Sequence, residues 1–226
     1  MIVQLKETVL PTNLKHCIKT MDLKTDLNFL TKEPHCALFC GMTGGGKTVF
    51  VLDLLQTVYR YHFEHIVVFC TTLKYNKSYK DRKFVWTDGE IYLVNPSDKL
   101  SECLEHYYNL FEGTRSLFVV DDCSAEKDIV KKRNSLAKLA FSGRHAGISV
   151  WILTQKYNSI LKDFREQLKT VVLFFTKDKH SFNECLDEND VIESKEEKDK
   201  IKQRLRKERF CKLVLKTDFP SQYKCL

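Results

Sequence analysis

Apolar residues gather along this chain in short continuous runs separated by amphipathic stretches. The strongest runs lie at residues 35–40, 65–72, 116–122, 148–155 and 170–176. Continuous rather than alternating apolar character is typical of strands covered on both faces, as in a parallel sheet. Weaker runs predict two more strands, at 91–94 and 210–216.

Helical periodicity fills the intervals between these runs. Helical spacing relates Val51, Leu54, Leu55 and Val58, and it predicts a helix over 47–61. Residues 73–90 are polar and are expected to be irregular, while further helices are expected at 97–111, 126–141, 159–168, 178–188 and 193–208. Alternating strands and helices predict an α/β fold with a mostly parallel central sheet flanked by helices.

The length of 226 residues, 43% of them hydrophobic, is enough for one domain with a substantial core. We expect an arm over 1–33 that packs on the core and a single domain over 34–226. The sequence has no uninterrupted run of 18 apolar residues, so no membrane-spanning helix is predicted. The first residues also lack the apolar stretch of a secretory signal.

Cysteine usage and charge narrow the class of protein further. The nine cysteines include no Cys-x-x-Cys pair, which favours reduced, buried thiols in a cytosolic or nuclear protein over a zinc site. The net charge of +7 suits a polyanionic partner, but charge alone does not identify one.

A glycine-rich loop follows the first apolar run. Gly41, Gly46, Lys47 and Thr48 stand at phosphate-loop (Walker A) spacing between a predicted strand and a predicted helix, a context that a flexible glycine turn does not explain. In such loops the backbone N–H groups and the helix N-terminus bind phosphate. Lys47 is expected on the β- and γ-phosphates and Thr48 on Mg²⁺. We therefore expect ATP to be bound by Gly41, Met42, Thr43, Gly44, Gly45, Gly46, Lys47, Thr48 and Val49.

The run at 116–122 ends in two carboxylates, Asp121 and Asp122, which form a Walker B pattern. Open α/β sheets bind ligands at the carboxyl ends of their strands, so Asp121 is expected to hold Mg²⁺. Asp122 stands where a carboxylate could polarise the attacking water. Its role as base is a hypothesis, because many NTPases with an added catalytic strand use the longer glutamate at this position. A helix N-cap is the alternative for both residues.

The run at 148–155 ends in Thr154 and Gln155. This polar tip predicts the additional-strand class, in which one strand separates the phosphate-loop strand from the Walker B strand. Gln155 would then sense the γ-phosphate, because an amide can donate to a phosphate oxygen and accept from water. The alternative is a polar residue that merely ends a strand. A nucleotide-kinase fold would not account for this strand or for the glutamine at its end.

Residues 142–155, Ser-Gly-Arg-His-Ala-Gly-Ile-Ser-Val-Trp-Ile-Leu-Thr-Gln, carry a more specific signal. With the phosphate loop and the two aspartates, they resemble the FtsK–HerA superfamily of P-loop ATPases. Within it, the chain is most similar to DNA-packaging ATPases of poxviruses, giant viruses and virus-like transposons. The resemblance covers about residues 35–176 and implies a RecA-like core.

The same resemblance implies a homo-oligomeric ring, a pentamer or hexamer, that drives double-stranded DNA into a capsid and works beside capsid portal or vertex proteins. It implies action in the host cytoplasm or nucleus, and transient presence on the virion. Arg144 is then the candidate arginine finger for a neighbouring subunit's nucleotide, and Arg165 is the second candidate. A salt bridge is the alternative role for either arginine. His145 is expected to be structural.

Two basic segments are candidates for DNA contact. Residues 74–83 contain five basic residues and two tyrosines against one acid, which suits phosphate contacts with aromatic packing, or a solvated loop. Residues 195–209 contain eight basic and four acidic residues, and their spacing favours a solvated helix face.

The function that these patterns predict is an ATP-hydrolysing DNA translocase of the viral packaging type with composite active sites. Two alternatives stay open at this stage. One is a P-loop helicase or another nucleic-acid-stimulated NTPase, which strand separation on a forked substrate would reveal. The other is a nucleotide-switched scaffold without turnover, which tight ATP binding without DNA-stimulated hydrolysis would reveal.

Overall fold

A computed structural model describes residues 3–4, 23–80, 89–96, 99–121, 123 and 134–226. Asp122 therefore lies outside the described residues. So do residues 81–83 of the first basic segment, and the opening residues of the helices expected at 97–111 and 126–141.

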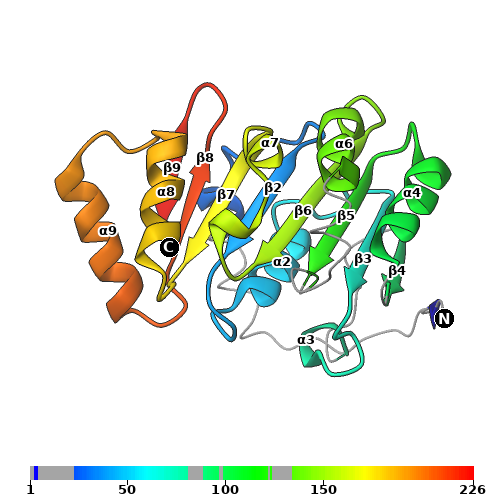
Figure 1. The fold of residues 1–226 in the computed structure, drawn as a ribbon, viewed down its shortest axis with the longest axis horizontal. Coiled ribbons are helices and arrows are strands. Elements are labelled where there is room, and N and C mark those ends of the chain that lie inside the picture. Colours follow the sequence, from blue (N-terminus) through cyan, green and yellow to red (C-terminus); the bar gives the residue numbers. More distant parts are fainter. Residues whose placement is uncertain (1–2, 5–22, 81–88, 97–98, 122, 124–133) are drawn as a thin grey trace.

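The described strands form one sheet in the order β1-β4-β3-β5-β6-β2-β7-β8-β9 (Figure 1). The six strands from β4 to β7 in this order are parallel, whereas β1, β8 and β9 pair antiparallel. The strands are β1 (Val3–Gln4), β2 (Cys36–Cys40), β3 (His65–Cys70), β4 (Glu90–Val94), β5 (Ser116–Asp121), β6 (Ile148–Thr154), β7 (Leu168–Phe174), β8 (Lys212–Lys216) and β9 (Gln222–Cys225).

Helices cover both faces of the sheet, which explains the continuous apolar runs. Side chains of α4, α6, α7, α8 and α9 share one buried cluster, and α2 packs in the other with Leu27 and Leu30 (Figure 1). The helices are α2 (Lys47–Gln56), α3 (Lys77–Lys80), α4 (Leu100–Phe111), α6 (Asn134–Gly143), η1 (Tyr157–Ser159), α7 (Lys162–Arg165), α8 (Lys179–Asn189) and α9 (Lys195–Lys207).

Strand β6 lies between the phosphate-loop strand β2 and the Walker B strand β5, as the additional-strand prediction requires. Cys40 at the end of β2 pairs in register with Thr154 of β6. On the other side of β6, Leu153 pairs with Asp121 of β5. The three strands therefore end together at one edge of the sheet, where ligands of open α/β sheets bind.

Several predicted boundaries were wrong, each for a local reason. The helix expected over 47–61 ends at Gln56. There the Thr57 N–H donates to the Leu54 carbonyl, three residues back instead of four, and the Thr57 hydroxyl donates to the Asp53 carbonyl at 2.6 Å. Residues 73–90 are not wholly irregular, since Asn76 Oδ1 accepts from Ser78 N and opens α3. The helix expected over 159–168 is divided into η1 and α7. The strand expected at 210–216 is β8, which begins at Lys212, and the strand β9 that follows it was not predicted.

The first part of the chain packs on the core where the structure describes it. Val3–Gln4 pairs with β4, and Leu27 and Leu30 are buried. The Tyr59 hydroxyl donates to the Thr31 carbonyl at 2.9 Å, which ties this segment to the turn after α2. No described helix has both the length and the apolar character needed to cross a membrane.

His35, just before β2, is a buried polar residue of the core. Its Nδ1 lies 2.8 Å from the Glu33 carbonyl, and the Trp151 indole N–H donates to its Nε2 at 3.2 Å. These bonds need a neutral imidazole with its proton on Nδ1. Burial accordingly lowers the pKa of His35 to about 4, and the Lys169 charge adds to this effect.

We expect the neutral His35 to make stability depend on pH. Below the unfolded-state pKa of about 6.5 the unfolded chain takes up a proton that the folded chain refuses, so stability falls as pH falls. Between pH 7 and pH 5 this effect is about 2 kcal/mol. Urea unfolding at both pH values should show it in the wild type and in an exposed-histidine control, His106→Asn, but not in His35→Asn. An equal pH dependence in His35→Asn would contradict the assignment.

Candidate nucleotide site

The phosphate loop is anchored to the strands on both sides of β2. Gly41 N donates to the Thr154 carbonyl at 3.2 Å, and Met42 N donates to the Phe175 carbonyl at 3.1 Å. A Cβ atom on Gly41 would lie 2.6 Å from Phe174 Cβ. The loop therefore needs glycine at its first position, because the backbone leaves β2 directly against β7.

Two further glycines let the loop turn into α2. Gly44 and Gly46 have φ angles of 74° and 96°, in the left-handed region that favours glycine. Gly46 is the N-cap of α2, and no side chain caps this helix end. The first N–H groups of α2 can therefore serve an anion, as phosphate loops require.

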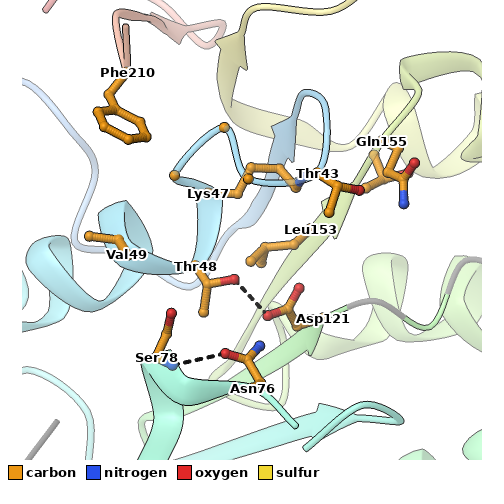
Figure 2. Close-up of a pocket in the computed structure, with 14 residues that line it drawn as sticks. Thr43, Lys47, Thr48, Val49, Asn76, Ser78, Asp121, Leu153, Gln155 and Phe210 are labelled. Carbon is orange, nitrogen blue, oxygen red and sulfur yellow. Dashed lines mark hydrogen bonds between the residues drawn. The ribbon is translucent and has the colours of Figure 1, made fainter. Parts of the chain in front are cut away.

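A cavity of about 300 Å³ lies over this loop (Figure 2). The predicted residues Gly41 and Met42 lie outside its lining, since they anchor the loop to the sheet. The Lys47 ammonium donates to their carbonyls at 2.7 and 3.2 Å. The lining residues are Thr43, Gly44, Gly45, Gly46, Lys47, Thr48, Val49, Asn76, Ser78, Asp121, Leu153, Thr154, Gln155 and Phe210.

The Thr48 hydroxyl donates to Asp121 Oδ2 at 2.9 Å, which joins the Walker A and Walker B motifs across β6 (Figure 2). A hydroxyl and a carboxylate are hard oxygen donors of the kind that Mg²⁺ prefers. Their proximity at the mouth of the phosphate loop fits Mg²⁺ bound together with phosphate oxygens.

Tyr79 of α3 donates a second hydrogen bond to the same carboxylate oxygen. Its side chain is buried, with 2% of its surface exposed, and its hydroxyl donates to Asp121 Oδ2 at 2.8 Å. Burial, and then the negative charge of Asp121, raise the pKa of Tyr79 well above its usual value. The phenol thus stays protonated and keeps its donor.

Of the remaining predicted residues, Gln155 lies at the cavity, whereas Arg144 and His145 lie away from it. Gln155 lines the cavity on the side of Asp121 (Figure 2). Arg144 is exposed in the turn before β6, at the amino end of the strand whose carboxyl end reaches the cavity. It therefore cannot serve its own chain's cavity. His145, also exposed, lies in the same turn.

Arg165 is occupied elsewhere, so its candidacy as a finger is not supported. Only 9% of its side chain is exposed, and it pairs with Glu184 at 2.9 Å and Glu188 at 3.2 Å. Its guanidinium also lies 4.7 Å from the centre of the Tyr157 ring. These contacts make Arg165 a brace between α7 and α8.

The sequence did not predict several residues around the cavity, among them Asn76, Ser78, Tyr79 and Phe210. The first three lie in the segment expected to be irregular, and its Asn-x-Ser order is a turn signal that could have drawn attention to it. Phe210 follows the charged run of α9, and no local pattern relates it to the phosphate loop.

Comparison with known proteins bears out the family resemblance. The family model described as Poxvirus A32 protein matches residues 23–209. DNA packaging protein OPG160 of Variola virus is 26% identical in an alignment of 141 residues that covers 58% of this chain and 49% of that protein. The Monkeypox virus protein of the same name is also 26% identical, over 58% of this chain and 44% of its own length. The chain thus spans about half the length of these relatives.

Solved structures confirm the predicted RecA-like fold. B204, the DNA-packaging ATPase from Sulfolobus Turreted Icosahedral Virus, has a TM-score of 0.59 at 14% identity, covering 86% of this chain and 98% of B204. B204 from Sulfolobus turreted icosahedral virus 2 in complex with ATP-gammaS has a TM-score of 0.55 at 14% identity, with 87% and 97% covered. The cytoplasmic domain of EssC has a TM-score of 0.52 at 17% identity, with 67% and 33% covered.

We expect Tyr79→Phe to lower the free energy of unfolding by about 2 kcal/mol, since a buried carboxylate loses one charge-assisted hydrogen bond. Urea unfolding measures this change. Tyr75→Phe is the matched control, because Tyr75 is exposed on the same segment and should change stability by less than about 0.5 kcal/mol. Equal effects of the two substitutions would show that the Tyr79 bond to Asp121 is not stabilising.

Proposed function

Because the chain belongs to the poxvirus A32 protein family, we propose that it is an ATP-hydrolysing motor that packages double-stranded viral DNA into capsids. The observation that carries the proposal is the 2.9 Å hydrogen bond between Thr48 and Asp121. It brings the phosphate loop and the Walker B carboxylate to one cavity across an inserted strand. The similarity to the viral DNA packaging proteins and to B204 supports the packaging role.

The residues around the cavity suggest a division of tasks. The loop 41–49 would bind the phosphates, and Lys47 would turn from the Gly41 and Met42 carbonyls to the β- and γ-phosphates. Thr48 and Asp121 would hold Mg²⁺, which neutralises phosphate charge when bound. Gln155 would contact the γ-phosphate from the tip of β6. Asp122, next in the chain, is the proposed base for the attacking water.

The segment from Lys74 into the start of α3 would connect DNA to this site. Lys74, Tyr75 and Lys77 are exposed, whereas Asn76 and Ser78 of the same segment line the cavity. A cationic, aromatic surface of this kind suits the DNA backbone rather than base edges. The helix α9 fits a solvated role, since Ile201 and Leu205 are buried and its basic residues lie mainly on the exposed side.

The proposed assembly is a pentameric or hexameric ring in which Arg144 completes a neighbouring subunit's site. Arg144 is exposed at the amino end of β6, away from its own chain's cavity, and this position supports a role in trans rather than in cis. A guanidinium there would stabilise charge on the transferring phosphoryl group. Capsid portal or vertex proteins are the proposed further partners, and the host cytoplasm or nucleus is the proposed place of action, with transient presence on the virion.

ATP hydrolysis measured with and without duplex DNA tests the function. We expect DNA to stimulate turnover, with stimulation falling steeply as salt rises. Lys47→Ala should lower turnover at least about 100-fold, because phosphate charge loses its main cationic partner. The exposed-lysine control Lys207→Ala should stay near wild type. Tight ATP binding without turnover would favour a nucleotide-switched scaffold, and strand separation on a forked substrate would favour a helicase.

Mixing two inactive variants tests the shared site. Arg144→Ala subunits retain Lys47, and Lys47→Ala subunits retain Arg144, so a mixed ring contains some complete sites. We expect partial recovery of ATPase activity in rings that co-purify through two different affinity tags. Arg206→Ala, which removes an exposed arginine, should remain active by itself. Co-purified mixed rings with no recovery would contradict a finger in trans.

A further inference from the structure

Phe210 lies at the nucleotide cavity although it comes late in the chain. It precedes β8, which runs antiparallel to β7, and Lys212 pairs in register with Phe174 at the end of β7. The start of β8 therefore meets the edge where the parallel strands end. In the sheet order, β7 and β8 lie on one side of β2, and β6 and β5 lie on the other.

The cavity thus has two chemically different ends. Asp121 and Gln155 lie at one end, and Val49 and Phe210 lie at the other, on opposite sides of Thr48 (Figure 2). Val49 and Phe210 expose 40% and 49% of their surfaces, so both present apolar area to the cavity beside its polar walls. An apolar end next to a phosphate site suits the flat, weakly polar part of a nucleotide.

The Phe210 ring is held in place by its surroundings. A Cβ atom on Gly46 would lie 3.2 Å from Phe210 Cδ1, so the ring edge rests over the start of α2. The Arg209 guanidinium carbon lies 4.7 Å from the ring centre, in a cation–π contact. The backbone of Phe210 has a φ of 65°, a left-handed conformation that is strained for an aromatic residue and typical of functional sites.

We propose that Phe210, with Val49 beside it, is the platform on which the nucleobase stacks. This inference rests on the proposed nucleotide binding and adds how the base is recognised. With the γ-phosphate directed at Asp121 and Gln155, the ribose and base extend toward Phe210. Stacking uses the π-face that every base has, so ATP and GTP should depend on Phe210 to the same degree.

Binding of two ligands to the full chain tests the proposal. ATPγS carries a base, whereas inorganic tripolyphosphate carries only the phosphates, and both are titrated calorimetrically with Mg²⁺ present. We expect Phe210→Ala to weaken ATPγS roughly tenfold and to leave tripolyphosphate unchanged. Phe210→Trp should restore ATPγS affinity, because indole also stacks. The control Phe219→Ala removes a phenylalanine that is exposed in the β8–β9 turn and should change neither ligand.

The other outcomes separate the alternatives. Equal weakening of both ligands would overturn the stacking role and make Phe210 a support for the phosphate loop. Unchanged ATPγS affinity in Phe210→Ala would also overturn it, and would assign the exposed ring to a subunit or DNA contact. A wild-type chain that binds neither ligand would refute the proposed nucleotide binding itself.

Discussion

The parallel alignment of β2, β5 and β6 is the constraint on which the candidate site depends. All three strands end at the same edge, so residues from distant parts of the chain meet there. The close approach of Gly41 to Phe174 fixes where the loop leaves the sheet. From that fixed point, Thr48 reaches Asp121 even though β6 lies between their strands.

Two hydroxyls donate to the same oxygen of Asp121, which supplies hydrogen bonds to a buried carboxylate. Thr48 belongs to the phosphate loop, and Tyr79 belongs to the segment that also carries the exposed Lys74 and Lys77. Breaking the hydrogen bonds of a buried charge is costly, so a shift of this segment would directly change the hydrogen bonding of the Asp121 carboxylate. This chain of contacts links the proposed DNA contact physically to the proposed site of hydrolysis.

Arg144 and Arg165 illustrate how burial assigns roles to the same residue type. Arg165 is enclosed by Glu184, Glu188 and Tyr157, and removing it would leave two carboxylates poorly compensated. Arg144 is exposed at the sheet edge farthest from its own cavity. Of the two arginines, only Arg144 has a guanidinium that is accessible to another subunit.

The sequence by itself determined the α/β class, the inserted strand and the motif residues, because these depend on short-range patterns. Lys47 and Thr48 follow from local spacing, and Asp121 follows from its place at the end of an apolar run. Only the tertiary structure brought Tyr79 and Phe210 to the cavity, since no spacing rule relates them to the phosphate loop. The tertiary structure also set where the helices end, because helix ends depend on individual hydrogen bonds such as the one from the Thr57 hydroxyl to the Asp53 carbonyl.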